Sequence, residues 1–266
     1  MSPPTTSVLE TIVARTRERV AERRRVRSLE DVRAAARAAP RRRPFAEALA
    51  RPGRINVIAE HKRRSPSRGS IREDLAPAEV ARAYERGGAA ALSVLTDEDH
   101  FGGRLEHLVE ARSATALPAL RKDFVIDPFQ VWEARAAGAD AILLIVAALG
   151  DRELAALLAE AAAAGLEALV EVHDRQEVDR ALAGGARVVG VNNRDLKTLA
   201  VSLETATSLA SRIPDSVVAV AESGIKTGAD VRRLREAGYD AFLVGERLMS
   251  SPDPGAALQA LIEEAR

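Results

Sequence analysis

Short apolar runs alternate with amphipathic, alanine-rich segments from Arg54 to the end of the chain. Runs such as AILLIV and VVAVA contain no polar alternation, which is typical of strands covered on both faces in a parallel sheet. The pattern predicts strands at Ile55–Glu60, Ala90–Leu95, Leu117–Arg121, Ala141–Val146, Ala168–Val172, Val188–Val191, Val217–Ala221 and Ala241–Val244. It predicts helices near Pro77–Arg86, Leu105–Ser113, Pro128–Ala136, Arg152–Ala163, Arg175–Ala183, Leu203–Arg212, Ala229–Glu236 and Pro254–Ala265.

Glycine marks the helix ends, as in Gly87-Gly88 and Gly184-Gly185. A helix end with glycine followed by an apolar run recurs in four segments: GGAAALSVL, AGADAILLI, GGARVVGV and AGYDAFLVG. Glycine just past a helix accepts the left-handed backbone that closes it. Eight βα units predict an α/β fold, a (β/α)8 TIM barrel forming a single domain over residues 1–266, with residues 1–54 as an N-terminal helical extension. A doubly wound open sheet is the alternative. No GxGxxG follows the first strand and no P-loop pattern occurs, so the usual nucleotide anchors are missing.

Charge is unevenly distributed although the whole chain is neutral. Residues 1–54 contain fourteen Arg, no Lys and six acidic residues. Such a segment can be a nucleic-acid-binding arm. The near-helical spacing of Ile12, Val13 and Val20 instead favours a helix whose basic face is solvated or packed on an acidic barrel.

Composition excludes several classes of site. The chain has no cysteine, so disulfides, thiolate metal sites and cysteine nucleophiles are excluded. Aromatic residues make up 3% of the chain, which disfavours stacking platforms for nucleic acid. Neither a signal pattern nor an apolar run of membrane-spanning length occurs. We expect a cytoplasmic monomer without metal, cofactor, nucleic-acid partner or membrane contact.

Lysine is rare, with four residues against thirty-five arginines, and each one follows an apolar run: Lys62, Lys122, Lys197 and Lys226. An arginine stays protonated, whereas a lysine amine can give up its proton when it is desolvated. Lysine retained at strand ends therefore indicates that the amine itself has a chemical role there. Chance in an arginine-rich composition is the alternative.

Polar side chains also cluster at the predicted strand ends, where a barrel carries its chemistry. Glu60, Lys122, Glu171, Asn192 and Glu222 each end or follow an apolar strand. Alone, Glu60–Lys62 or Lys122–Asp123 would be interpreted as an ordinary surface ion pair. Together at one barrel edge, carboxylates and amines would shift each other's pKa, as acid–base catalysis requires.

Two loops add a phosphate signal. Ser223-Gly224 follows the seventh predicted strand and Gly245 follows the eighth. Barrels often bind a phosphate between these loops and a short extra helix. Phe101 and Phe124, each just past a strand, could form an apolar wall beside the site or serve only as loop anchors.

At these residues the chain resembles the indole-3-glycerol-phosphate synthase family, from Val8 to the C-terminus. The motifs that carry the resemblance are IAEHKRRSPSRG, SVLTDEDHFGG, PALRKDFVIDPFQVWEARAAGADAILLI, LVEVHD, VGVNNRDLKT, AESGI and LVGERLM. The resemblance implies a (β/α)8 barrel with an extra N-terminal helix. It implies conversion of 1-(2-carboxyphenylamino)-1-deoxyribulose 5-phosphate to indole-3-glycerol phosphate, carbon dioxide and water in tryptophan biosynthesis, without a cofactor.

The resemblance also implies residue roles. Lys122 matches the general acid for ring closure, Glu171 the base for dehydration, and Lys62 a lysine that contacts the phosphate and can donate protons. The remaining implied site residues are Glu60 and Asn192, which orient the substrate, Glu222 and Ser223, which complete the site, Arg194 for the anthranilate carboxylate, Gly224 and Gly245 for the phosphate, Phe101, Phe124 and Leu143 around the aromatic ring, and Ser65 as a further substrate contact.

Three features depart from the family pattern. His61 stands where an aliphatic residue is usual, and we expect its side chain to point away from Glu60 and Lys62. Glu246 replaces a small hydroxyl residue, so we assign it no phosphate contact. The N-terminal helix has no aromatic residue to cover the substrate ring.

Two other functions remain open from the residues. A sibling phosphate-binding barrel such as phosphoribosylanthranilate isomerase is the first, although that reaction needs a cysteine or an equivalent base. A nucleic-acid-binding role of the arginine-rich arm is the second.

Overall fold

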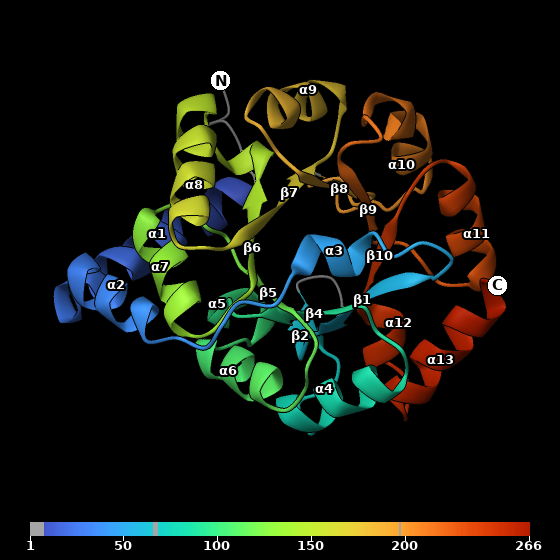
Figure 1. The fold of residues 1–266 in the computed structure, drawn as a ribbon, viewed down its shortest axis with the longest axis horizontal. Helices are drawn as coiled ribbons and strands as arrows, with labels where there is room; N and C mark the ends of the chain where they lie inside the picture. Colours follow the sequence, from blue (N-terminus) through green and yellow to red (C-terminus); the bar gives the residue numbers. More distant parts are fainter. Residues whose placement is uncertain (1–7, 66–68, 197) are drawn as a thin grey trace, which may run out of the picture.

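Eight parallel strands form a closed barrel in the computed structural model, which describes residues 8–65, 69–196 and 198–266 (Figure 1). The strands are hydrogen-bonded in the cyclic order β1-β10-β9-β8-β7-β6-β5-β4. Their bounds are β1 Asn56–His61, β4 Ala91–Leu95, β5 Ala119–Lys122, β6 Ala141–Ile145, β7 Glu167–Val172, β8 Val188–Asn192, β9 Val218–Glu222 and β10 Ala241–Val244. Closure excludes the open doubly wound sheet and confirms the predicted barrel, because β1 pairs with both β10 and β4.

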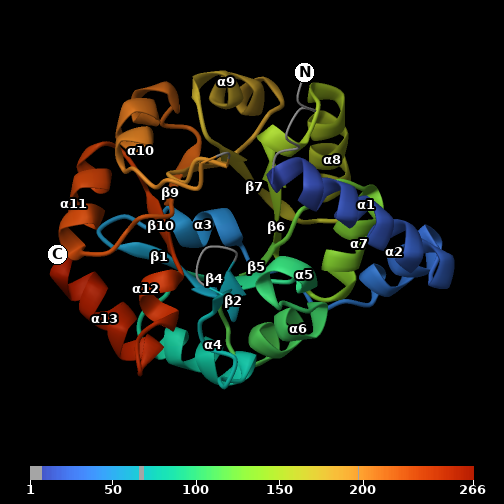
Figure 2. The same cartoon turned by 180° about the vertical axis from the view of Figure 1, so that it is seen from behind.

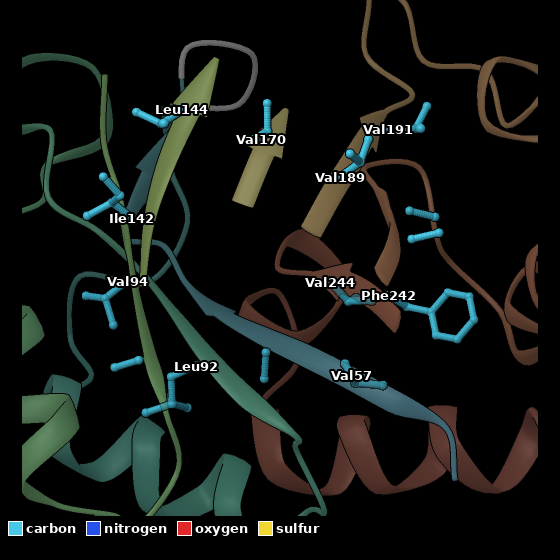
Figure 3. Close-up of a cluster of buried hydrophobic side chains, with 14 of the residues drawn as sticks. Val57, Leu92, Val94, Ile142, Leu144, Val170, Val189, Val191, Phe242 and Val244 are labelled. Atoms are coloured by element: carbon cyan, nitrogen blue, oxygen red, sulfur yellow. The ribbon is translucent and has the colours of Figure 1, made fainter. Parts of the chain in front are cut away.

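Alternate strand residues enter two separate cores. Val57, Val94 and Leu144 point outward and pack in the layer between strands and helices, which Figure 3 shows. Ile58 and Leu169 point inward and fill the barrel. Since side chains alternate with period two along a strand, an inward apolar residue fixes the next-but-one residue as inward too.

Helices follow the strands and cover the barrel, as the ring in Figure 1 shows. Their bounds are α4 Pro77–Arg86, α6 Leu105–Ser113, α7 Pro128–Ala136, α8 Asp151–Ala163, α9 Arg175–Ala183, α10 Glu204–Leu209, α11 Gly228–Glu236 and α13 Pro254–Glu264. Aspartates begin several of them: the Asp127 and Asp174 side chains accept hydrogen bonds from the backbone N–H of Phe129 and Glu177. Such caps satisfy N–H groups that a helix start leaves without partners.

The N-terminal extension contacts both ends of the barrel. It contains α1 Val8–Val26, α2 Leu29–Arg37 and α3 Phe45–Leu49. Phe45 and Leu49 join the interior core, so α3 closes the end where the strands begin (Figure 1). In the reverse view α1 lies in front, beside α7 (Figure 2).

The arginines of α1 pair with acidic groups of the barrel. Arg19 lies 2.7 Å from Glu98, and Arg23 lies 3.3 Å from Glu133. Arg15 and Arg24 make further ion pairs with Asp99 and Asp127. The basic face of α1 is thus partly paired with the barrel and partly solvated, since Arg17 and Arg25 are exposed, which agrees with the predicted helix.

Several short elements were not predicted. They are α2 and α3 of the extension, the antiparallel pair β2 Arg64–Ser65 and β3 Gly69–Ser70, α5 Glu98–Phe101, α12 Glu246–Met249 and the 3-10 turns Val146–Ala148 and Ala210–Arg212. The last of these replaces the end of the helix predicted over Leu203–Arg212, because α10 stops at Leu209.

Candidate active site

Polar residues occupy inward positions toward the C-terminal ends of six of the barrel strands. Each stands two residues after an inward-facing residue, as Glu60 follows Ile58 and Glu171 follows Leu169. The set formed in this way is Glu60 on β1, Ser93 on β4, Lys122 on β5, Glu171 on β7, Asn192 on β8 and Glu222 on β9, all buried except the partly buried Lys122. The predicted catalytic strand-end residues are therefore brought together around one axis.

Lys122 is the central cation of this cluster. Its Nζ lies 3.1 Å from Oε2 of Glu171 and 3.4 Å from Oε2 of Glu222. Burial alone would lower the pKa of Lys122, but the charges of Glu171, Glu222 and Glu60 raise it well above its ordinary value. The expectation that desolvation would loosen this proton is wrong for Lys122, because carboxylates from three other strands outweigh the burial.

Glu171 carries a pKa well below its ordinary value. Burial opposes this shift, but the charge of Lys122 and contacts with His173 and Asn192 outweigh it. The group is therefore ionised at neutral pH. A carboxylate buried among groups that stabilise its charge is held ready to accept a proton.

The pKa of Glu222 is shifted in the opposite direction to that of Glu171. Burial, together with the negative charges of Glu171 and Glu60, raises the pKa of Glu222 to about 8, although Lys122 opposes the shift. Both carboxyl oxygens are buried, and no described group donates a well-aligned hydrogen bond to them. Gly190 on β8 makes room for this side chain: a Cβ there would lie 2.1 Å from Oε1 of Glu222.

Glu60 and Lys62 form a second acid–base pair. Nζ of Lys62 lies 3.0 Å from Oε1 of Glu60, and the Ser93 hydroxyl donates to Oε2 at 3.2 Å. Burial would raise the pKa of Glu60, but the charges of Lys62 and Lys122 lower it below its ordinary value. Glu60 is therefore a buried carboxylate with two cations near it.

The loops after β9 and β10 line a cavity of about 430 Å³ together with Glu60 and Lys62. Ser223 and Gly224 both adopt left-handed backbone conformations, with φ of 64° and 80°. Gly245 stands at the start of the four-residue helix α12, and a Cβ there would lie 2.6 Å from Glu60. The predicted phosphate loops are thus adjacent to the acid–base cluster.

A second, apolar cavity of about 120 Å³ adjoins the first. It is lined by Phe101 and Phe124 from the barrel and by Leu9 and Ile12 from α1. The polar or charged groups on its wall are Lys62, Ser65, Arg194 and Glu246. Aliphatic residues of α1 thus take the covering position for which the sequence offers no aromatic residue.

Arg194 borders both cavities. Its backbone N–H donates to the Asn192 side chain at 3.0 Å, and its guanidinium donates to the Leu199 carbonyl. Leu143 lies deeper, in the interior core against which Phe124 packs. The structure therefore places Leu143 beneath the apolar cavity rather than on its wall.

His61 points away from the cluster, as predicted. Its ring packs edge-on against the His107 ring of α6, with 6.0 Å between the centroids. Burial, with the charges of His107 and Arg63, lowers the pKa of His61 to about 4. His61 is thus a neutral packing residue behind β1.

Several contributors were missed from the sequence. Ser93 could have been found, because it occupies an inward position next to Glu60. His173 was not predicted as a site residue, yet its Nε2 lies 3.4 Å from Oε1 of Glu171. Of the four lysines, Lys197 lies outside the described residues, as do Pro66-Ser67-Arg68 of the first motif.

Over the residues that the structure describes, no group of three or more His, Asp and Glu side chains is arranged to hold a metal ion. Within the same ranges, none of the helices combines the length and the apolar character needed to cross a bilayer.

A family model and the similar proteins of known name indicate the same family. The family model described as "Indole-3-glycerol phosphate synthase" matches residues 9–261. "Indole-3-glycerol phosphate synthase 2" of Streptomyces coelicolor is 51% identical over 255 residues, 96% of this chain and 98% of the relative. "Indole-3-glycerol phosphate synthase" of Mycobacteroides abscessus is 50% identical over 256 residues, 96% of this chain and 94% of the relative.

A solved structure supports the fold alone. Thiamine phosphate pyrophosphorylase from Pyrococcus furiosus superimposes with a TM-score of 0.61 at 19% identity, over 83% of this chain and 96% of that one.

Proposed function

This chain belongs to the indole-3-glycerol phosphate synthase family, and from that premise we propose how its residues carry out the reaction. The enzyme is a carboxy-lyase of tryptophan biosynthesis. It closes the ring of 1-(2-carboxyphenylamino)-1-deoxyribulose 5-phosphate, releases carbon dioxide and eliminates water. The single observation that supports this assignment best is the Lys122–Glu171–Glu222 cluster beside a cavity lined by the Ser223, Gly224 and Gly245 loops.

The substrate spans the two adjoining cavities in this proposal. Its phosphate lies against Ser223, Gly224 and Gly245, and Lys62 supplies a positive charge at the boundary. Its aromatic ring enters the apolar cavity between Phe101, Phe124 and the α1 residues. Arg194 borders both cavities and binds the anthranilate carboxylate there as a planar cationic fork. Ser65 completes the contacts around the ring, and Leu143 supports this wall from beneath, in the core against which Phe124 packs.

Lys122 acts as the general acid. Its raised pKa keeps the ammonium protonated before the substrate arrives. Attack of the aromatic carbon on the ketone develops an alkoxide, which is a stronger base than the amine and takes the proton from Nζ. Glu60 and Asn192 orient the substrate, with Glu222 and Ser223 completing the wall. The aromatic carboxylate then leaves as carbon dioxide, and its bonding electrons restore the ring.

Glu171 acts as the base for dehydration: it takes a proton from the newly closed ring, while Lys62 donates a proton to the hydroxyl, which leaves as water. Its pKa is held down mainly by the charge of Lys122, which opposes the effect of burial. Once Lys122 has given its proton to the substrate, that charge is lost and Glu171 becomes a stronger base. The first step therefore prepares the second, because one ion pair links the acid to the base.

Partners and location follow from the same proposal. The enzyme binds a small sugar-phosphate and needs no metal, cofactor or nucleic acid. It works in the cytoplasm as a monomer. The ion pairs between α1 and the barrel support the lack of a nucleic-acid partner, because they engage arginines that a nucleic-acid arm would use.

The direct test mixes the purified chain with the arylamino-ribulose phosphate and follows indole absorbance and carbon dioxide release. We expect both signals in equal amounts. Phosphoribosylanthranilate supplied instead should give no isomerisation. Absence of indole with the first substrate, or turnover of the second, would overturn the assignment.

A further inference from the structure

His173 lies between two carboxylates at the edge of the active site. It follows β7 directly, two residues after Glu171. Its Nε2 lies 3.4 Å from Oε1 of Glu171, and its Nδ1 lies 3.0 Å from Oε2 of Glu177 on α9. Only 13% of the side chain is exposed.

Glu177 fixes the orientation of this ring. Its Oε2 accepts a hydrogen bond from the backbone N–H of His173 at 2.7 Å and also contacts Nδ1. The backbone N–H of Glu177 is in turn capped by Asp174 at 2.9 Å. Because backbone and ring are gripped by one carboxylate, Nε2 is aimed at Glu171.

The contact to Glu171 is long and is not aligned as a hydrogen bond, so Nε2 is buried without a well-made partner among the described residues. Catalytic contacts are often loose without substrate and tighten in the complex. Oε2 of Glu171 faces Lys122 while Oε1 faces His173, so the carboxylate is held between two nitrogen groups.

Charge around the ring favours the imidazolium. Burial would lower the pKa of His173, but its contacts with the carboxylates of Glu171 and Glu177, and their negative charges, raise it to about 10. Glu10 of α1, Asp174, Arg194 and Asp195 line the cavity that His173 borders. Three of these four groups are acidic, and one, Arg194, is cationic.

We propose that His173 is a positioning residue for the reaction: held by Glu177, it fixes one oxygen of Glu171 and keeps that base ionised until the dehydration step. This inference rests on the proposed function of Glu171. The Glu177–His173 pair thereby acts on the substrate only through Glu171. A ring that merely packs at the start of α9 would affect stability alone.

The first measurement determines the pKa of the His173 ring and does not depend on enzyme activity. NMR titration of the four histidines assigns His173 by the signal lost in His173→Asn. We expect His173 to titrate at about 10. In Glu177→Gln its pKa should fall by about one unit or more, because one of its two negative partners becomes neutral. A His173 that titrates below neutrality in the unaltered enzyme would overturn the proposal.

The second measurement links that charge to catalysis. In Glu177→Gln the alkaline limb of kcat should move to lower pH together with the His173 titration, while KM changes little. His173→Asn should lower kcat about tenfold or more, as loss of a group that orients a reacting side chain commonly does. An alkaline limb that stays in place while the NMR titration moves would contradict the proposal.

His100→Asn is the matched control. His100 also pairs with a carboxylate, since its Nδ1 lies 3.2 Å from Asp97, but it does not contact Glu171. We expect kcat and its pH profile to be unchanged. A thermal midpoint measured for every variant separates lost stability from lost positioning. If the unaltered enzyme makes no indole, the proposed function fails. The NMR result still decides whether His173 is a charged group held between Glu171 and Glu177.

Discussion

Lys122 concentrates the chemistry of the cluster in one side chain. We expect Lys122→Met to lower kcat by about 10²–10⁴-fold, because the methionine cannot donate a proton to the developing alkoxide. It should also destabilise the fold by about 3–5 kcal/mol, since buried carboxylates lose their common cation. Steady-state kinetics and urea unfolding check both effects.

Arg233→Met provides the matched loss of a cation, because Arg233 is half exposed and pairs with Glu204 on the surface. It should leave kcat unchanged and stability nearly so. A Lys122→Met enzyme that turns over as fast as this control would remove Lys122 from the mechanism.

Gly190 tests whether Glu222 needs the space that it occupies. The Cβ of Gly190→Ala would lie 2.1 Å from Oε1 of Glu222 and 3.0 Å from Leu169. Moving these groups should cost about 1–3 kcal/mol of unfolding free energy and lower kcat/KM. Gly184→Ala is the control, because its nearest contact would be an ordinary 3.4 Å. Equal stability of the two variants would refute the steric explanation.

Residue roles differ in how far the sequence reveals them. Lys122 and Glu171 stand out because a charge interrupts an apolar run at a strand end. Gly190 does not, because its neighbour Glu222 belongs to another strand. The sequence does not reveal the direction of the Lys122 pKa shift either. That direction depends on the combined charges of carboxylates that only the closed barrel brings together.

At the scale of elements, α1 is expected to serve binding more than chemistry. Its Leu9 and Ile12 line the apolar cavity, whereas Lys122 and Glu171 stand on strands. Deleting residues 1–27 should therefore raise KM much more than it lowers kcat, with the barrel still folded. Steady-state kinetics and circular dichroism give the answer. An unchanged KM would mean that α1 does not cover the substrate.

The predicted strands were found because each is a short, mainly apolar run covered on both faces, with its polar residues at few positions. The hairpin β2–β3 is too short and too polar for such a pattern, and the helix α3 has only five residues, so both were missed. Their formation depends on tertiary partners: the backbone N–H of Phe45 is held by Glu167, 122 positions away. Local periodicity carries no trace of such a contact.

At the scale of the whole molecule, the site makes stability depend on pH. The folded pKa of Glu222 is raised to about 8 from an ordinary 4.5. The folded state therefore binds this proton more tightly than the unfolded state, and the contribution of Glu222 to stability falls as pH rises from 4.5 through about 8. Glu171 acts in the opposite direction, since its folded pKa is lowered and its contribution is lost in acid.

Glu222→Gln removes the first of these dependences. Compared with the unaltered enzyme, this variant should be relatively more stable at about pH 9 than at about pH 5.5. Urea unfolding at the two pH values measures the difference. A stability difference between the two proteins that does not change with pH would show that Glu222 has an ordinary pKa in the fold.

The contact between Phe45 and Glu167 has a consequence for how the polypeptide is made. During synthesis the first 54 residues emerge from the ribosome well before Glu167 has been added to the chain. The partner strand of β1, β10, is synthesised later still. Until then the apolar side chains of Phe45 and Leu49 have no core to enter. Nascent chains are therefore most exposed to aggregation and proteolysis in the interval before the last strand emerges.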